Sequence, residues 1–239
     1  MTQYKKEGEF LGLYAISDLH LAFKLNKPMD VFGAEWLNHD KKIKRNWIQK
    51  ITENDTVLIA GDISWSMDIE GGEEDLNWIE ELPGRKIIGK GNHDYWWKSI
   101  TKLNQMYDNI SFLQNNFFVY EDYAICGTRG WIDKSFDNFD EHDKKIYRRE
   151  IMRLKLSLDS AVNEGYSKFI VMFHYPPFKD EKSDSEFTQI LEDYNVSKVI
   201  YGHLHGPALK SVNGNVIKNG VQYILTSCDY LKFDPLKIQ

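Results

Sequence analysis

Gly91-Asn92-His93-Asp94 follows directly on the apolar run KIIGK of residues 86–90. This run predicts a buried strand that enters a tight turn, so an amide, an imidazole and a carboxylate would lie together where the strand stops. Active sites of open α/β sheets form at such strand ends. Because Gly-Asn is also ordinary turn chemistry, the stretch indicates a site only if other strand ends supply partners.

Four further apolar segments of strand length run into residues of the same kinds. After residues 11–17, 55–60, 169–173 and 198–201 come, respectively, Asp18 and His20, Asp62, His174, and His203 and His205. Side chains alternate faces on extended backbone, so the two members of each pair share one face. A single Asp-x-His is most often a turn carboxylate and a surface histidine, but five strand ends with ligand-type residues are hard to reach by chance.

Carboxylate, amide and imidazole groups without thiolates suit borderline or hard divalent metals, namely Mn, Fe, Zn or Mg. With His93 and Asp94 set aside, the ligand candidates are Asp18, His20, Asp62, Asn92, His174, His203 and His205. Seven candidates exceed what one ion needs. We therefore expect two ions that share a carboxylate.

The composition, 42% hydrophobic and 28% charged residues in a chain of 239, is typical of a globular protein with a sizeable core. We expect one domain over residues 1–239, with residues 131–143 as a candidate lid loop. No apolar stretch is long enough to span a bilayer, and residues 1–7 precede no signal-peptide segment. We expect a cytoplasmic protein without membrane contact.

The formal net charge is −6, and no basic patch is evident, which argues against a long nucleic-acid substrate. Bound divalent cations would add positive charge where the carboxylates cluster, so a nucleic-acid substrate is not excluded. Cys126 and Cys228 lie far apart in apolar runs, so we expect buried free thiols. The oligomeric state and the role of these cysteines stay open.

Apolar periodicity predicts helices over residues 36–51, 73–82, from Trp97 to about Tyr107, 143–163 and 185–194. Asn213-Gly214-Asn215 predicts a hairpin turn between strands at residues 209–212 and 216–218.

Five motifs stand in the order of a known signature, namely Asp18-x-His20, Gly61-Asp62, Gly91-Asn92-His93-Asp94, His174 and Gly202-His203-x-His205. From residue 11 to about residue 228 the chain resembles the calcineurin-like metallophosphoesterase superfamily. The resemblance implies an α/β fold, a four-layer αββα sandwich of two mixed central sheets flanked by helices. It also implies that Asp18, His20 and His205 hold one metal, that Asn92, His174 and His203 hold the other, and that Asp62 bridges them.

The same resemblance implies a mechanism. Two metals lower the pKa of a bridging water, so hydroxide is available near neutral pH, and they neutralise the phosphoryl oxygens during in-line attack. His93 would protonate the leaving oxygen, or stabilise charge there, and Asp94 would orient its ring. No phosphoenzyme is required.

The phosphoester is a separate inference. Protein Ser/Thr phosphatases of this superfamily follow Gly-Asp with a motif that contains a phosphate-gripping arginine, whereas residues 63–66 here contain none. This favours a small organic or nucleotide-like phosphodiester, whose phosphate carries one charge. Arg129 is a candidate clamp at a strand end, although such an arginine is usually solvated. Trp65 and Trp131 are candidates to stack on a base or to form a leaving-group pocket, although they equally suit packing at sheet edges.

Two alternatives stay open. A phosphomonoesterase or nuclease with the same centre would need a basic groove or an arginine over the metals. A non-catalytic metal-binding scaffold would be expected to have lost a ligand or His93, and none of these residues is missing.

Overall fold

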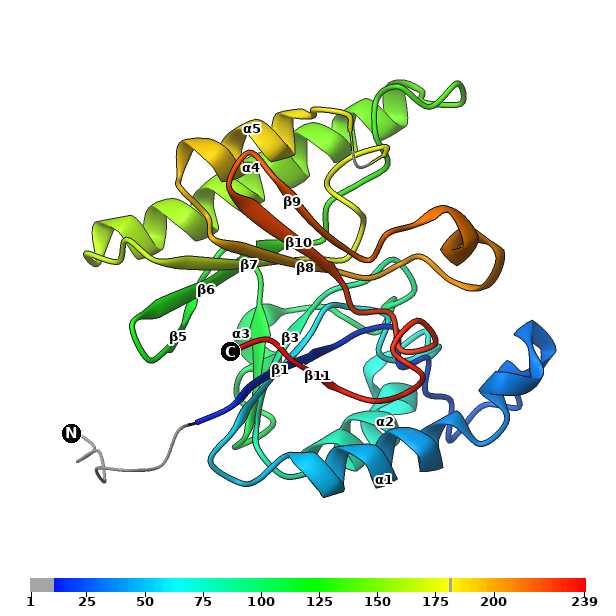
Figure 1. Ribbon diagram of the computed structural model, residues 1–239. Coiled ribbons are helices and arrows are strands. Elements are labelled where there is room, and N and C mark those ends of the chain that lie inside the picture. The colour runs from blue at the N-terminus through cyan, green and yellow to red at the C-terminus, as the bar shows by residue number, and fades with distance from the viewer. Residues whose placement is uncertain (1–10, 181) are drawn as a thin grey trace.

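The computed structural model describes residues 11–180 and 182–239, so the expectation for residues 1–7 lies outside the described residues. Two β-sheets pack face to face, and helices cover the outer face of each sheet (Figure 1). The expected α/β sandwich of two mixed sheets flanked by helices is confirmed. Among the described residues, we find no helix with the length and apolar character that crossing a membrane requires.

The first sheet has the strand order β11-β1-β2-β3-β4, in which β11 alone is antiparallel to its neighbour. Its strands are β1 (Leu13–Ile16), β2 (Thr56–Ile59), β3 (Arg85–Gly89), β4 (Ile110–Leu113) and β11 (Leu236–Lys237). The helices on this side are α1 (His39–Lys50), α2 (Ile69–Glu80) and the short α3 (Ile100–Leu103).

The second sheet has the order β5-β6-β7-β8-β10-β9, with a parallel centre and antiparallel edge strands. Its strands are β5 (Phe118–Tyr120), β6 (Tyr123–Thr128), β7 (Phe169–Phe173), β8 (Lys198–Tyr201), β9 (Asn215–Lys218) and β10 (Val221–Leu225). The helices α4 (Glu141–Asn163) and α5 (Glu186–Asp193) cover its outer face.

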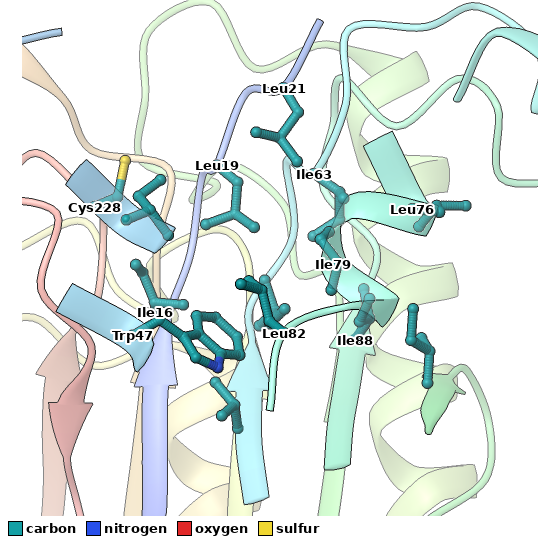
Figure 2. Close-up of a cluster of buried hydrophobic side chains, with 14 of the residues drawn as sticks. Ile16, Leu19, Leu21, Trp47, Ile63, Leu76, Ile79, Leu82, Ile88 and Cys228 are labelled. Carbon is teal, nitrogen blue, oxygen red and sulfur yellow. The ribbon is translucent and has the colours of Figure 1, made fainter. Parts of the chain in front are cut away.

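Alternation along the buried strands produces the layers. In β1, Ala15 packs in the cluster between the two sheets, whereas its neighbour Ile16 packs in the outer cluster against the helices. Figure 2 shows that outer cluster, in which Ile16 lies near Trp47 of α1 and Leu76 belongs to α2. Both faces of each central strand are therefore buried, which explains why these strands appear as continuous apolar runs in the sequence.

Two local expectations are wrong. Residues 213–215 do not form a hairpin turn, because Gly206–Ser211 forms a 3₁₀ helix and β9 pairs with β10 across Asn219-Gly220. Both turn residues have positive φ, 49° and 85°, as a two-residue hairpin loop requires. The helix expected to reach Tyr107 is limited to α3, Ile100–Leu103. Cys126 and Cys228 are buried free thiols, as expected.

Candidate metal centre

The loops after five parallel strands meet at one edge of the sandwich. They follow β1, β2, β3, β7 and β8 and carry Asp18 and His20, Asp62, Asn92 and His93, His174, and His203 and His205, respectively. Backbone hydrogen bonds join the first two loops, because the Asp18 N–H donates to Gly61 O at 2.9 Å and the His20 N–H donates to Asp62 O at 3.0 Å. The structure thus brings the seven predicted ligands into one cluster.

Asp18, His20 and His205 form one group, in which the candidate ligand atoms all lie within 4.8 Å of one another. His205 Nε2 lies 3.2 Å from Asp18 Oδ1. Two buried ring nitrogens, His20 Nδ1 and His205 Nε2, make no hydrogen bond within the described part of the chain. Buried polar atoms without partners are uncommon in native proteins, and a cation beside them would satisfy both.

A second group surrounds the Asn92 amide oxygen. Asn92 Oδ1 lies 2.7 Å from His174 Nε2 and 3.0 Å from His203 Nδ1. The other nitrogen of His174, Nδ1, lies 3.1 Å from Ala60 O and donates to it, so Nε2 is the nitrogen with a free lone pair. This arrangement presents two imidazole nitrogens and one amide oxygen to a single point.

Asp62 lies between the two groups. Its Oδ2 is 3.4 Å from His174 Nε2 and 3.8 Å from His20 Nε2. Its Oδ1 accepts a hydrogen bond of 2.8 Å from the His93 N–H. Asp62 is thus in a position to contact ions in both groups, and Asp18 also lies near the second group, with its Oδ1 3.8 Å from His174 Nδ1.

The backbone at this edge is strained. Asp18, His20, Asp62 and His203 have φ values of 60°, 47°, 53° and 71°, in the left-handed region that few non-glycine residues adopt. Each such residue costs on the order of 1–3 kcal/mol, and such strain gathers at functional sites. Four strained positions among seven predicted ligands therefore point to a site whose geometry is selected for function.

The glycines of the motifs permit close approach between loops. A Cβ atom at Gly91 would lie 2.0 Å from Asp62 Oδ1, and one at Gly202 would lie 2.3 Å from Asp18 Oδ2. Any side chain at either position would displace a carboxylate of the cluster.

Burial makes the cluster electrostatically unfavourable without a cation. Burial, together with the negative charge of Asp18, raises the pKa of Asp62 to about 8. Burial alone would lower the pKa of His205, but the carboxylates of Asp18 and Asp229 outweigh it and raise that pKa to about 10. A divalent cation would offset the repulsion between the two buried carboxylates. The donor set, the unpartnered nitrogens and the charge balance all fit two metal ions.

His93 lies beside the cluster, whereas Asp94 lies beneath it. Asp94 is fully buried, and its carboxylate accepts hydrogen bonds from the N–H groups of Asp62, Ile63, Ser64 and Gly91 and from the Trp96 indole. No described contact joins this carboxylate to the His93 ring. Asp94 thus holds the Asp62 loop in place, which differs from the expected role of orienting His93.

The three expected substrate contacts have different surroundings. Trp65 stacks on His20, with ring centroids 4.7 Å apart, and its ring lies 4.3 Å from that of His93. Arg129 Nη2 instead lies 3.7 Å from the buried carboxylate of Glu150, and the guanidinium covers the Trp131 ring at 4.5 Å. Among the described side-chain contacts of these three residues, those of Trp65 reach the metal-ligand cluster directly, whereas Arg129 contacts it through its backbone oxygen, which accepts the His174 N–H at 3.1 Å.

A pocket of about 240 Å³ opens over the cluster; we call it the His93 pocket. Its lining residues are His20, Met29, Phe32, Trp36, Asp62, Trp65, His93, His203, His205, Gly206 and Pro207. Apolar and aromatic side chains thus face the imidazoles across the pocket.

Sequence reasoning missed Asp229. Its Oδ1 lies 3.0 Å from His205 Nδ1, and its Oδ2 accepts a 3.1 Å hydrogen bond from the Gly206 N–H. A carboxylate that accepts a hydrogen bond from Nδ1–H fixes the tautomer in which His205 Nε2 is the ligand atom. Asp229 follows β10 closely, so its position after a sixth apolar strand was the available signal.

Comparison with known proteins agrees with this geometry. The family model for calcineurin-like phosphoesterases matches residues 12–207. The gene 66 protein of Mycobacterium phage L5 is 37% identical over 197 residues, 82% of this chain and 78% of the relative. The corresponding protein of phage D29 is 25% identical over 209 residues, 85% and 83% of the two chains.

A solved structure, that of phosphopantetheinyl hydrolase from Mycobacterium tuberculosis, has a similar fold, with a TM-score of 0.57 at 14% identity, covering 90% of this chain and 88% of that one. The match to the family model covers most of the chain and includes every strand-end motif described above. The chain therefore belongs to the calcineurin-like phosphoesterases, a family of metal-dependent phosphoester hydrolases.

Proposed function

We propose that the protein is a two-metal phosphodiesterase that acts on a small organic or nucleotide-like phosphodiester. Candidate ions are Mn, Fe, Zn or Mg. Asp18, His20 and His205 would hold one ion, Asn92, His174 and His203 would hold the other, and Asp62 would contact both. The convergence of these side chains and the unpartnered nitrogens of His20 and His205 support this assignment.

When bound, the ions supply an activated water and neutralise charge on the phosphoryl oxygens. Hydrolysis joins a water oxygen to phosphorus as the bond from phosphorus to the leaving oxygen breaks, and the leaving oxygen gains negative charge. His93 lines the pocket and holds a proton at that leaving oxygen. Its backbone N–H donates a hydrogen bond to Asp62 Oδ1, which holds the backbone of His93 beside the cluster.

The observation that carries the choice of a diester is the lining of the His93 pocket. Its described lining residues include no lysine or arginine, whereas Met29, Phe32 and Trp65 are apolar or aromatic. A monoester dianion needs an additional positive group, which a singly charged diester does not. A nearby ammonium, that of Lys27, lies 3.3 Å from the centre of the Trp65 ring in a cation–π contact.

The test compares bis(p-nitrophenyl) phosphate with p-nitrophenyl phosphate on protein loaded with Mn. We expect kcat/KM for the diester to be at least about tenfold higher than for the monoester. The monoester dianion would lack one charge-assisted hydrogen bond, and the loss of one such bond corresponds to a factor of this size. Treatment with EDTA should abolish both activities. Faster monoester cleavage would overturn the choice of a diester and indicate Lys27 or Arg129 as a clamp. Two bound ions without turnover would favour the scaffold alternative.

Asp229→Ala is expected to lower the affinity for one of the two ions by roughly 10- to 100-fold, because His205 loses the acceptor that fixes its tautomer. Asp229→Asn keeps one oxygen for His205 Nδ1 and should give an intermediate affinity. Titration with a competing chelator, read by metal analysis, measures this effect directly. An unchanged affinity in the alanine variant would show that Asp229 does not position His205.

A further inference from the structure

We propose that a second, aromatic pocket on the other side of His203 binds the organic group that the phosphate retains, and that this group contains a planar, nucleobase-like ring. The inference rests on the proposed phosphodiesterase function. It is based on a cavity of about 560 Å³, which we call the Trp131 pocket, whose lining includes His203, Trp131 and Tyr175.

The position of His203 links the two cavities. This residue lines both the His93 pocket and the Trp131 pocket, so a single predicted metal ligand separates them. A phosphodiester at the metal cluster has two ester oxygens, and each cavity can take the group on one of them. Because His93 acts on the leaving oxygen, the leaving group lies in the His93 pocket. The retained group therefore belongs to the Trp131 pocket.

The sizes of the two cavities assign a larger group to the Trp131 pocket. At about 560 Å³ it lies within the usual range of small-molecule sites, roughly 300–1,000 Å³, whereas the His93 pocket of about 240 Å³ lies below that range. The substrate is thus an unsymmetrical diester with a small leaving group and a larger retained group.

The wall of the Trp131 pocket is a row of aromatic rings that begins at the cluster. The Tyr175 ring lies 4.1 Å from the His203 ring and 5.1 Å from the Trp131 ring. Phe136 continues the lining, although 42% of its surface is exposed. Aromatic faces in a row bind planar rings by stacking, which tolerates different bases.

Phe136, at the exposed end of this wall, is held in place outside the hydrophobic core. Lys179 donates to Ser135 O at 3.2 Å, and its ammonium lies 5.4 Å from the centre of the Phe136 ring. The Trp131 indole donates to Asp143 at 3.0 Å. By contrast, Phe178 at the base of the pocket packs against Tyr201 and Tyr223 in the hydrophobic core. Phe136 can therefore be replaced without removing core packing.

Two p-nitrophenyl esters with the same leaving group test the retained side alone: thymidine 5′-(p-nitrophenyl phosphate) and methyl p-nitrophenyl phosphate. We expect kcat/KM to be at least about tenfold higher for the thymidine ester, and Phe136→Ala to remove most of that ratio, since stacking on one ring accounts for a change of this size. Leu156→Ala, which shortens a 53% exposed side chain on α4, is the control and should leave the ratio unchanged.

Calorimetry with thymidine and the metal-free protein gives a readout that needs no turnover. We expect thymidine to bind and Phe136→Ala to weaken binding at least about fivefold. Equal kcat/KM for the two esters together with no thymidine binding would overturn the pocket while the phosphodiesterase function stands. Thymidine binding without hydrolysis of either ester would support the pocket and overturn the proposed function instead.

Discussion

Asp62→Asn is expected to lower kcat for phosphodiester hydrolysis by at least about 10³-fold, because losing a bridging carboxylate removes several kcal/mol of transition-state stabilisation. Asp62 Oδ2 is the atom that lies near both ligand groups, 3.4 Å from His174 Nε2 and 3.8 Å from His20 Nε2. Asparagine keeps the size of the side chain and an oxygen for the His93 N–H, but it loses the charge. The effect should therefore fall on metal binding and chemistry rather than on the loop.

Metal content and thermal stability separate this effect from misfolding. The variant should retain fewer than two ions per chain. Because burial and Asp18 raise the pKa of Asp62 to about 8, its carboxyl ionises more readily in the unfolded chain than in the metal-free fold. The stability of the metal-free fold therefore falls as pH rises from roughly pH 4 to about pH 8. The metal-free variant should thus melt no lower than the wild type at pH 7. Asp193→Asn, an exposed residue on α5, is the matched control. Two bound ions with activity within tenfold of wild type would contradict the bridging role.

His93→Ala is expected to lower kcat by about 10²- to 10³-fold, the range typical of losing a hydrogen-bond donor to a developing negative charge, with larger losses for poorer leaving groups. Burial, together with the positive charges of His174 and Lys27, lowers the pKa of His93 to about 4. The ring in the metal-free protein is therefore neutral at pH 7, and its one ring N–H donates a hydrogen bond that stabilises negative charge on the leaving oxygen.

A series of aryl methyl phosphates measures this role. The slope of log kcat against leaving-group pKa should be steeper in the variant, because the oxygen of phenolate carries more negative charge than that of p-nitrophenolate and so gains more from the His93 N–H. His142→Ala, which removes an exposed imidazole on α4, should leave both the rate and the slope unchanged. Parallel slopes for His93→Ala and wild type would show that His93 does not act on the leaving oxygen.

The sequence predicted the location of the cluster from local patterns, whereas the fold class of two packed sheets was predicted from the resemblance to the calcineurin-like metallophosphoesterases. Each central strand is apolar along its length, as strands buried on both faces must be. Parallel strands in one sheet end at the same edge, so the ligand-type residues after β1, β2 and β3 meet, as do those after β7 and β8. The packing of the two sheets then brings both edges together. The true hairpin at Asn219-Gly220 was also readable from its dipeptide, although the signal at residues 213–215 obscured it.

The partners of the charged side chains could not be predicted from the sequence. Asp94 binds backbone about 30 residues away, Arg129 pairs with Glu150, and Asp229 contacts His205 from 24 residues further along the chain. Each contact depends on which side chains the packed layers bring within about 3–4 Å, and sequence spacing carries no such information.

Local pattern by itself thus determined where the candidate ligands lie, because periodicity and turn chemistry act over a few residues. Only the tertiary structure decided what orients them and which cavities surround them. Asp229, the Asp94 hydrogen bonds and the two pockets beside His203 all arise where loops from different strands pack together. Such packing is a property of the whole fold, in which every contact depends on the positions of both sheets.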